Sequence, residues 1–254
     1  MRGLFSFRPY IARDRRCGGV SFDFWIADRV AKAWYDSGAD QELPEKTWCR
    51  EHIRPGFHAV DCGAHHGMMT VLFSKWVGPN GSVTAYEVVP KNRKVIQRNL
   101  DLNGCSNVVI RAAGVGARSE RQALSANGGN ATSHPSRFMR RLDVVSLDDD
   151  LGDRRVDFLK IDVEGSEVAT LRGAARILKR DRPVLCIEVH TFLFRDPRAA
   201  IGEIFSILDP LDYRYELLGD VLGSVSALPK QRLEAIAAHN TPHLFCTPIT
   251  RAAA

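Results

Sequence analysis

The sequence predicts an α/β fold with a mostly parallel sheet and helices on both of its faces. Short apolar runs alternate along the chain with segments whose apolar residues recur every three to four positions. A glycine-bounded turn follows the first of these runs, and a glutamate stands near the end of the next, as in sheets that bind a nucleotide at their strand ends. With 254 residues, 44% of them hydrophobic, the chain is long enough to bury such a core.

We expect residues 1–45 to form a helical extension, because FWIADRVAKAWY (24–35) has the composition of a helix, and residues 46–254 to form one domain. The net charge of +5 partly reflects arginines in the first sixteen residues, which are typical of a solvated basic segment. Six cysteines without a CxxC pair predict buried free thiols. The absence of a long apolar run or signal-peptide core predicts a soluble, cytoplasmic protein.

Five apolar runs are predicted to be strands of the sheet. They are HAVDC (58–62), SVTAYEV (82–88), NVVIRAA (107–113), VDFLKIDV (156–163) and PVLCIEVH (183–190). A helix is predicted in each of three gaps between them. Two, around 69–76 and around 168–178, are indicated by apolar residues that share one helical face, and the third, over 91–104, ends with Asn103 and Gly104, which suit a left-handed cap. YRYELLG and HLFCTPIT, near the end of the chain, predict a final pair of strands.

Residues 114–150 interrupt this alternation. They contain SANGGNATSHPS (125–136), whose glycines and small polar residues are typical of a loop, and then a short strand that leads into the acidic turn SLDDDL. An insertion here lies near the carboxyl ends of the strands, where open α/β sheets bind ligands. We therefore interpret residues 114–150 as a mobile lid over the substrate.

The turn VDCGAHHG (60–67) has the pattern D-x-G-x-x-x-G between a strand and an amphipathic helix. Gly63 and Gly67 leave room for a ligand, and the helix start offers unpaired N–H groups. Glu87 is expected to bind ribose hydroxyls across the same crevice. Because neither GxGxxG nor a phosphate loop is present, a cofactor with ribose but no phosphate fits best. S-adenosyl-L-methionine is such a cofactor.

The segments VDCGAHHGMMTVLFSKWVGPNGSVTAYEVVPKNRKVIQRNLDLNG, VVSLDDDL, VDFLKIDVEGSEVATLRGA and PVLCIEVH resemble, in this order, the signature blocks of the FkbM-type S-adenosylmethionine-dependent methyltransferases. The resemblance spans roughly residues 50–190. It implies a Rossmann-like class I methyltransferase fold with seven strands, and O-methylation of a hydroxyl on a sugar, glycan or natural product, including lipid-linked acceptors. The cofactor-binding residues expected from the pattern and the resemblance are Asp61, Gly63, Ala64, Gly67, Glu87, Val88 and Ala113.

Two positions depart from the family pattern. His65 and His66 stand where the family commonly has a pair such as Asn-Ile, and Val88-Val89 replaces Pro-Asn after Glu87. The valines predict a more apolar wall for the adenine. For the histidines, a turn-filling or cofactor-contacting role is favoured over a metal site, because no third ligand stands nearby in the sequence.

Asp162, Glu188 and His190 are the candidate catalytic residues, because they stand at the ends of two central strands. A hydroxyl acceptor needs a general base, or a divalent ion such as Mg²⁺ or Mn²⁺ that lowers its pKa. His190 fits a base and a structural hydrogen-bonding residue equally well. Glu167, and less firmly Glu164, are interpreted as residues that complement the following helix.

Two other functions stay open at this point: a nicotinamide-dependent oxidoreductase on a similar sheet, and a non-catalytic cofactor-binding module. Nucleic acid is not expected as a partner, because no segment interleaves basic and aromatic residues. The sequence leaves a homo-oligomer open and does not identify the acceptor.

Overall fold

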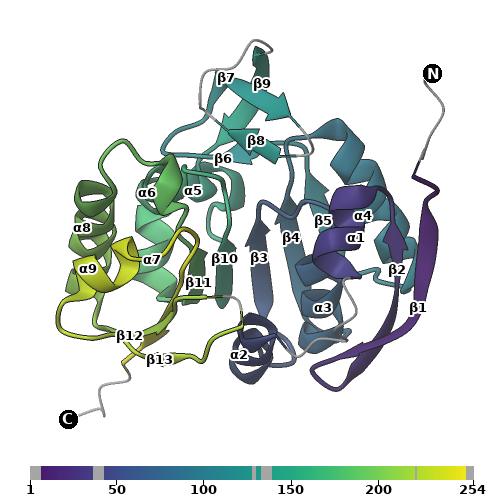
Figure 1. Cartoon of the computed structure of the whole chain (residues 1–254), viewed down its shortest axis with the longest axis horizontal. Helices are drawn as coiled ribbons and strands as arrows, with labels where there is room; N and C mark the ends of the chain where they lie inside the picture. The colour runs from purple at the N-terminus through teal and green to yellow at the C-terminus, as the bar shows by residue number, and fades with distance from the viewer. Residues whose placement is uncertain (1–6, 37–42, 128–129, 133–138, 221, 250–254) are drawn as a thin grey trace.

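A computed structural model describes residues 7–36, 43–127, 130–132, 139–220 and 222–249, and the side chains of 125–140 are not described. A mixed sheet of eight strands forms its centre (Figure 1). In spatial order the strands are β13 (Ser226–Ala227), β12 (Tyr213–Leu218), β14 (His243–Pro248), β11 (Val184–Glu188), β10 (Phe158–Ile161), β3 (His58–Cys62), β4 (Ser82–Tyr86) and β5 (Val108–Arg111). The five strands predicted from the apolar runs are all present, and each is parallel to its neighbours among the five.

The final strand pair is also confirmed, and β14 runs antiparallel to both β11 and β12. The eighth strand, β13, is a two-residue edge strand beside β12. The sheet thus has the seven expected strands and one short addition.

Helices cover both faces of the sheet because strand residues alternate between two apolar clusters. One cluster contains Ala59 and Phe158 with α2 (Pro44–His52), α3 (Met68–Val77) and α4 (Pro90–Leu102). The other contains Val60 and Leu159 and is covered by α5 (Leu147–Leu151), α6 (Glu167–Arg172), α7 (Ala175–Asp181), α8 (Pro197–Leu208) and α9 (Arg232–Ala237). Two 3₁₀ turns, Thr191–Leu193 and Asp209–Leu211, flank α8. This alternation places Lys160 on the face that α2 covers.

The N-terminal extension differs from the prediction. It begins with an antiparallel hairpin, β1 (Tyr10–Cys17) and β2 (Val20–Ile26), and only then forms the short helix α1 (Arg29–Tyr35). Phe22, Phe24 and Ile26 alternate with less buried residues, so the strand buries one face against α3 and α4. Residues 24–26, expected in a helix, therefore belong to a strand.

The insertion at 114–150 forms a second, small sheet (Figure 1). Its strands, in spatial order, are β6 (Gly114–Val115), β9 (Met139–Val145), β7 (Glu120–Asn127) and β8 (Asn130–Thr132). The SANGGNATSHPS loop predicted at 125–136 lies partly outside the described residues; its described part includes the end of β7 and the whole of β8. The division into an extension, one domain and a lid stays a prediction.

All six cysteines are free, and five of them are buried, as expected. No helix in the described part of the chain is long and apolar enough to span a bilayer.

Candidate functional site

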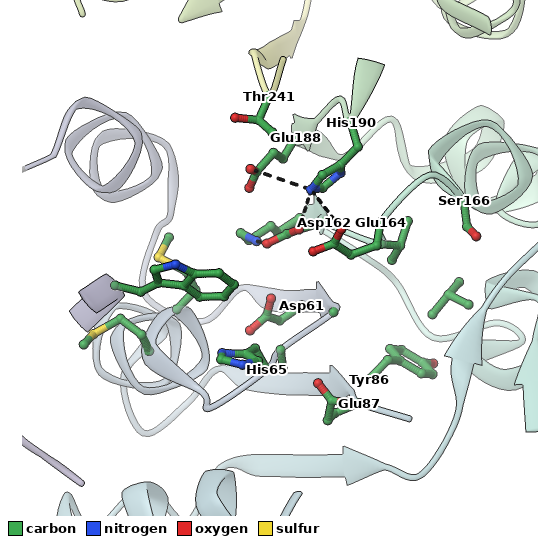
Figure 2. Close-up of a pocket in the computed structure, with 18 of the residues that line it drawn as sticks. Asp61, His65, Tyr86, Glu87, Asp162, Glu164, Ser166, Glu188, His190 and Thr241 are labelled. Atoms are coloured by element: carbon green, nitrogen blue, oxygen red, sulfur yellow. Dashed lines mark hydrogen bonds and ion pairs between the residues drawn. The ribbon is translucent and has the colours of Figure 1, made fainter. Parts of the chain in front are cut away.

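A cavity of about 980 Å³ lies at the carboxyl ends of the central strands. Residues that follow β3, β4, β10 and β11 line it, together with residues of α1, α2, α3 and the small sheet. Figure 2 shows Asp61, His65 and Glu87 in one part of it and Glu188 and His190 in another. Of the residues expected to bind a cofactor or to act in catalysis, only Gly67 is outside this lining.

The glycine turn closes tightly against its neighbours. Gly63 has a positive φ of 85°, and a Cβ there would overlap the backbone oxygen of Asp162, so only glycine fits. The backbone N–H groups of Gly63 and Ala64 both donate to the carbonyl of Tyr86 at 3.0 Å. The turn thus uses these two N–H groups to hold the end of β4, ahead of the start of α3 at Met68, where unpaired N–H groups were expected.

Gly67 was expected to bind the cofactor, but it does not line the cavity. It caps α3 with a φ of 85°, and a Cβ there would lie 3.2 Å from Ile96 of α4. Gly67 thus permits close packing of the turn on α4 and does not face the cavity.

Glu87 is a buried carboxylate at the end of β4. Its Oε1 accepts a hydrogen bond from Val89 N at 2.6 Å, and burial raises its pKa to about 7 despite the backbone N–H groups of Val89 and His65. A group that donates hydrogen bonds, such as a ribose hydroxyl, would offset the cost of burying this carboxylate. The position therefore suits the ribose role predicted for Glu87.

An apolar wall extends from Glu87 to the small sheet. Val88 packs against Leu124 of β7 and Val144 of β9, and Ala113 lines the cavity nearby. The small sheet thus covers the end of the cavity next to Val88, where an adenine would lie. The expected role of the insertion as a cover over the substrate stays a prediction.

Asp162, Glu188 and His190 come together at the ends of β10 and β11, as the sequence predicted. His190 Nε2 lies 3.7 Å from Asp162 Oδ1, 3.8 Å from Glu188 Oε1 and 3.8 Å from Glu164 Oε2. His190 Nδ1 bonds Glu167 Oε1 at 2.6 Å, and Glu167 is fully buried. The assignment of Glu167 to helix stabilisation alone is therefore incomplete, because Glu167 also orients His190.

His190 and Glu188 differ in their protonation at neutral pH. Burial disfavours the charged His190, but the hydrogen bond to Glu167 and the charges of Asp162 and Glu188 outweigh it and raise the pKa of His190 to about 9. Burial and the charge of Asp162 raise the pKa of Glu188 to about 7. At neutral pH, His190 is thus protonated, while Glu188 is poised to accept a proton.

Three further charged residues surround the cluster, and sequence reasoning missed all of them. Buried Lys160 donates a hydrogen bond to Asp162 Oδ2 at 2.8 Å. Burial of Asp162 raises its pKa, but the charges of Lys160 and His190 outweigh this effect and hold the pKa of Asp162 below its usual range. His243 Nε2 lies 3.5 Å from Glu188 Oε2 and 3.6 Å from Glu45 Oε2. Lys160 could have been found from the sequence, because it is a lysine inside the apolar run FLKI. Nothing in the sequence indicates Glu45 or His243, because both lie far from the ends of β10 and β11 along the chain.

Metal binding is compatible with only one group of at least three His, Cys, Asp or Glu residues in the described chain: Asp162, Glu188 and His190, whose ligand atoms lie within 4.8 Å of one another. His65 and His66 stack on each other with ring centroids 4.0 Å apart. Their stacking is compatible with the turn-filling role, and the place of His65 in the cavity lining with the cofactor-contacting role, and both stay predictions.

Comparison with known proteins gives a family match over most of this region. The FkbM methyltransferase domain family matches residues 61–216. "Methyltransferase 1" of Beauveria bassiana (strain ARSEF 2860) is 32% identical over 142 residues, which cover 45% of this chain and 57% of that protein.

Solved structures show the same fold. Methyltransferase FkbM from Methylobacillus flagellatus KT is 21% identical, with a TM-score of 0.50, over 87% of this chain and 56% of its own. An rRNA methylase from Streptococcus thermophilus is 14% identical, with a TM-score of 0.51, over 82% of this chain and 97% of its own. This chain thus spans little more than half the length of its fungal relative and of the Methylobacillus protein. The two structures show that the chain has the class I methyltransferase fold, and the family match shows that the chain belongs to the FkbM methyltransferase family.

Proposed function

We propose that the chain is an S-adenosyl-L-methionine-dependent O-methyltransferase. The observation that carries this proposal is one cavity lined both by the glycine turn with Glu87 and by a partly buried carboxylate, Glu188, whose pKa is about 7. A base with a pKa near the working pH combines a useful deprotonated fraction with a sufficient affinity for the proton. The family membership supports the cofactor.

In the proposed reaction, the acceptor oxygen attacks the methyl carbon of the sulfonium in line with the departing sulfur. The O–C bond forms, the C–S bond breaks, and Glu188 takes the hydroxyl proton. Protonated His190, held by Glu167, and Lys160, bonded to Asp162, balance the carboxylates around this point. Alignment of the two substrates in the cavity supplies a large part of the rate.

The same residues also offer a site for a divalent ion. His190 keeps Nε2 turned toward Asp162 and Glu188 while Glu167 holds Nδ1, which is a common arrangement around histidine ligands. Mg²⁺ or Mn²⁺ bound there would lower the pKa of the acceptor hydroxyl. We keep this as the second version of the proposal, because an oxygen-rich ligand set suits these ions.

For the acceptor, we propose a hydroxyl-bearing sugar, glycan, lipid-linked molecule or natural product rather than a nucleic acid. Six carboxylates line the cavity, those of Glu45, Asp61, Glu87, Asp162, Glu164 and Glu188, against Lys46, Lys160 and the protonated His190 and His243. The cavity therefore has no excess of positive groups, which a phosphate backbone would need. Free cysteines at all six positions support a cytoplasmic location for the enzyme.

Transfer of a labelled methyl group from S-adenosyl-L-methionine to sugar, lipid-linked and polyketide acceptors tests the function. We expect label on an acceptor oxygen and unchanged transfer in the presence of a chelator. Loss of transfer in chelator, restored by Mg²⁺ or Mn²⁺, would instead establish the metal version. If the protein bound NAD and not S-adenosyl-L-methionine, the proposed function would be wrong.

A further inference from the structure

Two polar atoms that line the cavity beside the glycine turn are buried without a hydrogen-bond partner among the described residues. They are Nε2 of His65 and Oδ1 of Asp61. His65 is 9% exposed and Asp61 1% exposed. Because a buried polar group without a partner is costly, such atoms in a ligand cavity indicate where a ligand supplies the missing bonds.

Tyr35, from α1 of the N-terminal extension, determines which hydrogen-bonding role His65 plays. Its hydroxyl lies 2.7 Å from His65 Nδ1. Burial raises the pKa of Tyr35, so the phenol keeps its proton, and burial lowers the pKa of His65 to about 3, so the imidazole is neutral. The phenol therefore donates to Nδ1, and the ring hydrogen of His65 is on Nε2. The unpartnered atom of His65 is a donor.

Asp61 offers the opposite character. Its Oδ2 accepts from the hydroxyl of Thr70 at 2.5 Å, whereas Oδ1 has no partner among the described residues. A neutral donor on His65 and a carboxylate acceptor on Asp61 thus line the same part of the cavity (Figure 2). A ligand that satisfies both carries an acceptor and a donor close together, and the carboxylate and ammonium of an α-amino acid meet that requirement.

We propose that His65 is a positioning residue that donates from Nε2 to the carboxylate of the cofactor's amino-acid end, with Tyr35 fixing its tautomer and Asp61 accepting from the ammonium. The inference rests on the proposed function, because S-adenosyl-L-methionine carries its amino-acid end as a zwitterion. It assigns the extension a part in the binding site, since α1 supplies Tyr35 and also Trp34, whose ring centroid lies 5.0 Å from that of His65.

The test compares two ligands that differ only in this end of the molecule. S-adenosylhomocysteine has the amino-acid group, and 5′-methylthioadenosine lacks it. For His65→Phe, which keeps a ring but removes the donor, we expect roughly 10- to 100-fold weaker binding of S-adenosylhomocysteine by calorimetry. Binding of 5′-methylthioadenosine should change less than about 2-fold, since that ligand makes no bond to His65.

Tyr35→Phe provides a second variant that leaves the strained turn untouched, which matters because His65 has a positive φ of 49°. We expect roughly 2- to 10-fold weaker binding of S-adenosylhomocysteine alone, as for loss of one neutral hydrogen bond. Tyr215→Phe is the matched control, because its hydroxyl bonds Asp209 and Tyr215 is outside the cavity lining.

Equal losses for both ligands, or no loss for S-adenosylhomocysteine in folded variants, would overturn the role of His65. Failure of the wild-type protein to bind either ligand would instead remove the proposed function itself. The two failures are therefore distinguishable in one set of titrations.

Discussion

The half of the cavity next to β3 and β4 and the half next to β10, β11 and β14 are built in different ways. In the first, which we call the cofactor half, tight turns and neutral or singly charged groups such as His65 and Glu87 define the shape. In the second, the acceptor half, Asp162, Glu188 and His190 interact so closely that no charge there is independent of the others. Shape can thus be expected to control binding in one half, and protonation to control chemistry in the other.

Glu188→Gln should give the largest loss of activity, and it changes only the acceptor half of the cavity. Loss of the proton acceptor is expected to lower turnover roughly 10²- to 10⁴-fold. Steady-state methyl transfer measures it, with Glu203→Gln as control, because Glu203 pairs with Arg172 outside the cavity lining. Near-normal turnover in Glu188→Gln would exclude Glu188 as the base.

Gly63→Ala should break the cofactor half through its shape. A Cβ at this position overlaps the Asp162 carbonyl, so we expect a loss of at least about 2 kcal/mol in the free energy of unfolding. Gly56→Ala separates the overlap from the backbone strain, because Gly56 has a φ of 87° with open space around it, and should cost roughly 1 kcal/mol. Denaturant unfolding of both variants measures the two losses of unfolding free energy. Equal losses would show that the overlap of the new Cβ with the Asp162 carbonyl costs no stability.

The pH dependence of kcat/KM sharpens the description of the acceptor half. Glu188 must be deprotonated to act, so activity should rise as pH passes its pKa of about 7, and it should fall as His190 loses its proton near 9. The charged groups around Glu188 are Lys160 on β10, Asp162 directly after β10, His190, and His243 on β14. Glu45 on α2 pairs with His243. A rate profile that is flat from pH 5 to 9 would contradict this assignment.

The smallest effect concerns the small sheet, which we propose acts as a lid over the cofactor half. Because Leu124 and Val144 pack with Val88, cofactor alone should order it. Limited trypsin cleavage after the exposed Arg121 and Arg141 should slow when S-adenosylhomocysteine is added, without any acceptor. Protection that required an acceptor would place the lid over the acceptor half instead.

The five central strands and the meeting of Asp162, Glu188 and His190 were predictable, because parallel strands bring their carboxyl ends to one edge. The segment around 168–178 was expected to be one helix, but it divides at Gly173, where any side chain would overlap the carbonyl of Gly116 from the insertion. The period of the apolar residues carries no information about such a contact.

Other parts of the site depend on pairs that are distant in sequence. Tyr35 meets His65, and Glu45 meets His243, only because the extension and the last strand fold onto the same cavity. In β2, by contrast, the alternation of Phe22, Phe24 and Ile26 was present in the sequence, and the helical composition of the following residues obscured it.

Calorimetric titration of S-adenosylhomocysteine into the wild-type protein, Glu87→Ala and Glu188→Gln tests most directly whether the two halves have separate tasks. We predict that the wild-type protein binds this ligand and not NAD, that Glu87→Ala loses about 1 to 3 kcal/mol of binding free energy, and that Glu188→Gln stays within about 0.5 kcal/mol of wild type. An unchanged affinity in folded Glu87→Ala, together with a lost affinity in Glu188→Gln, would contradict the separation of cofactor and acceptor halves.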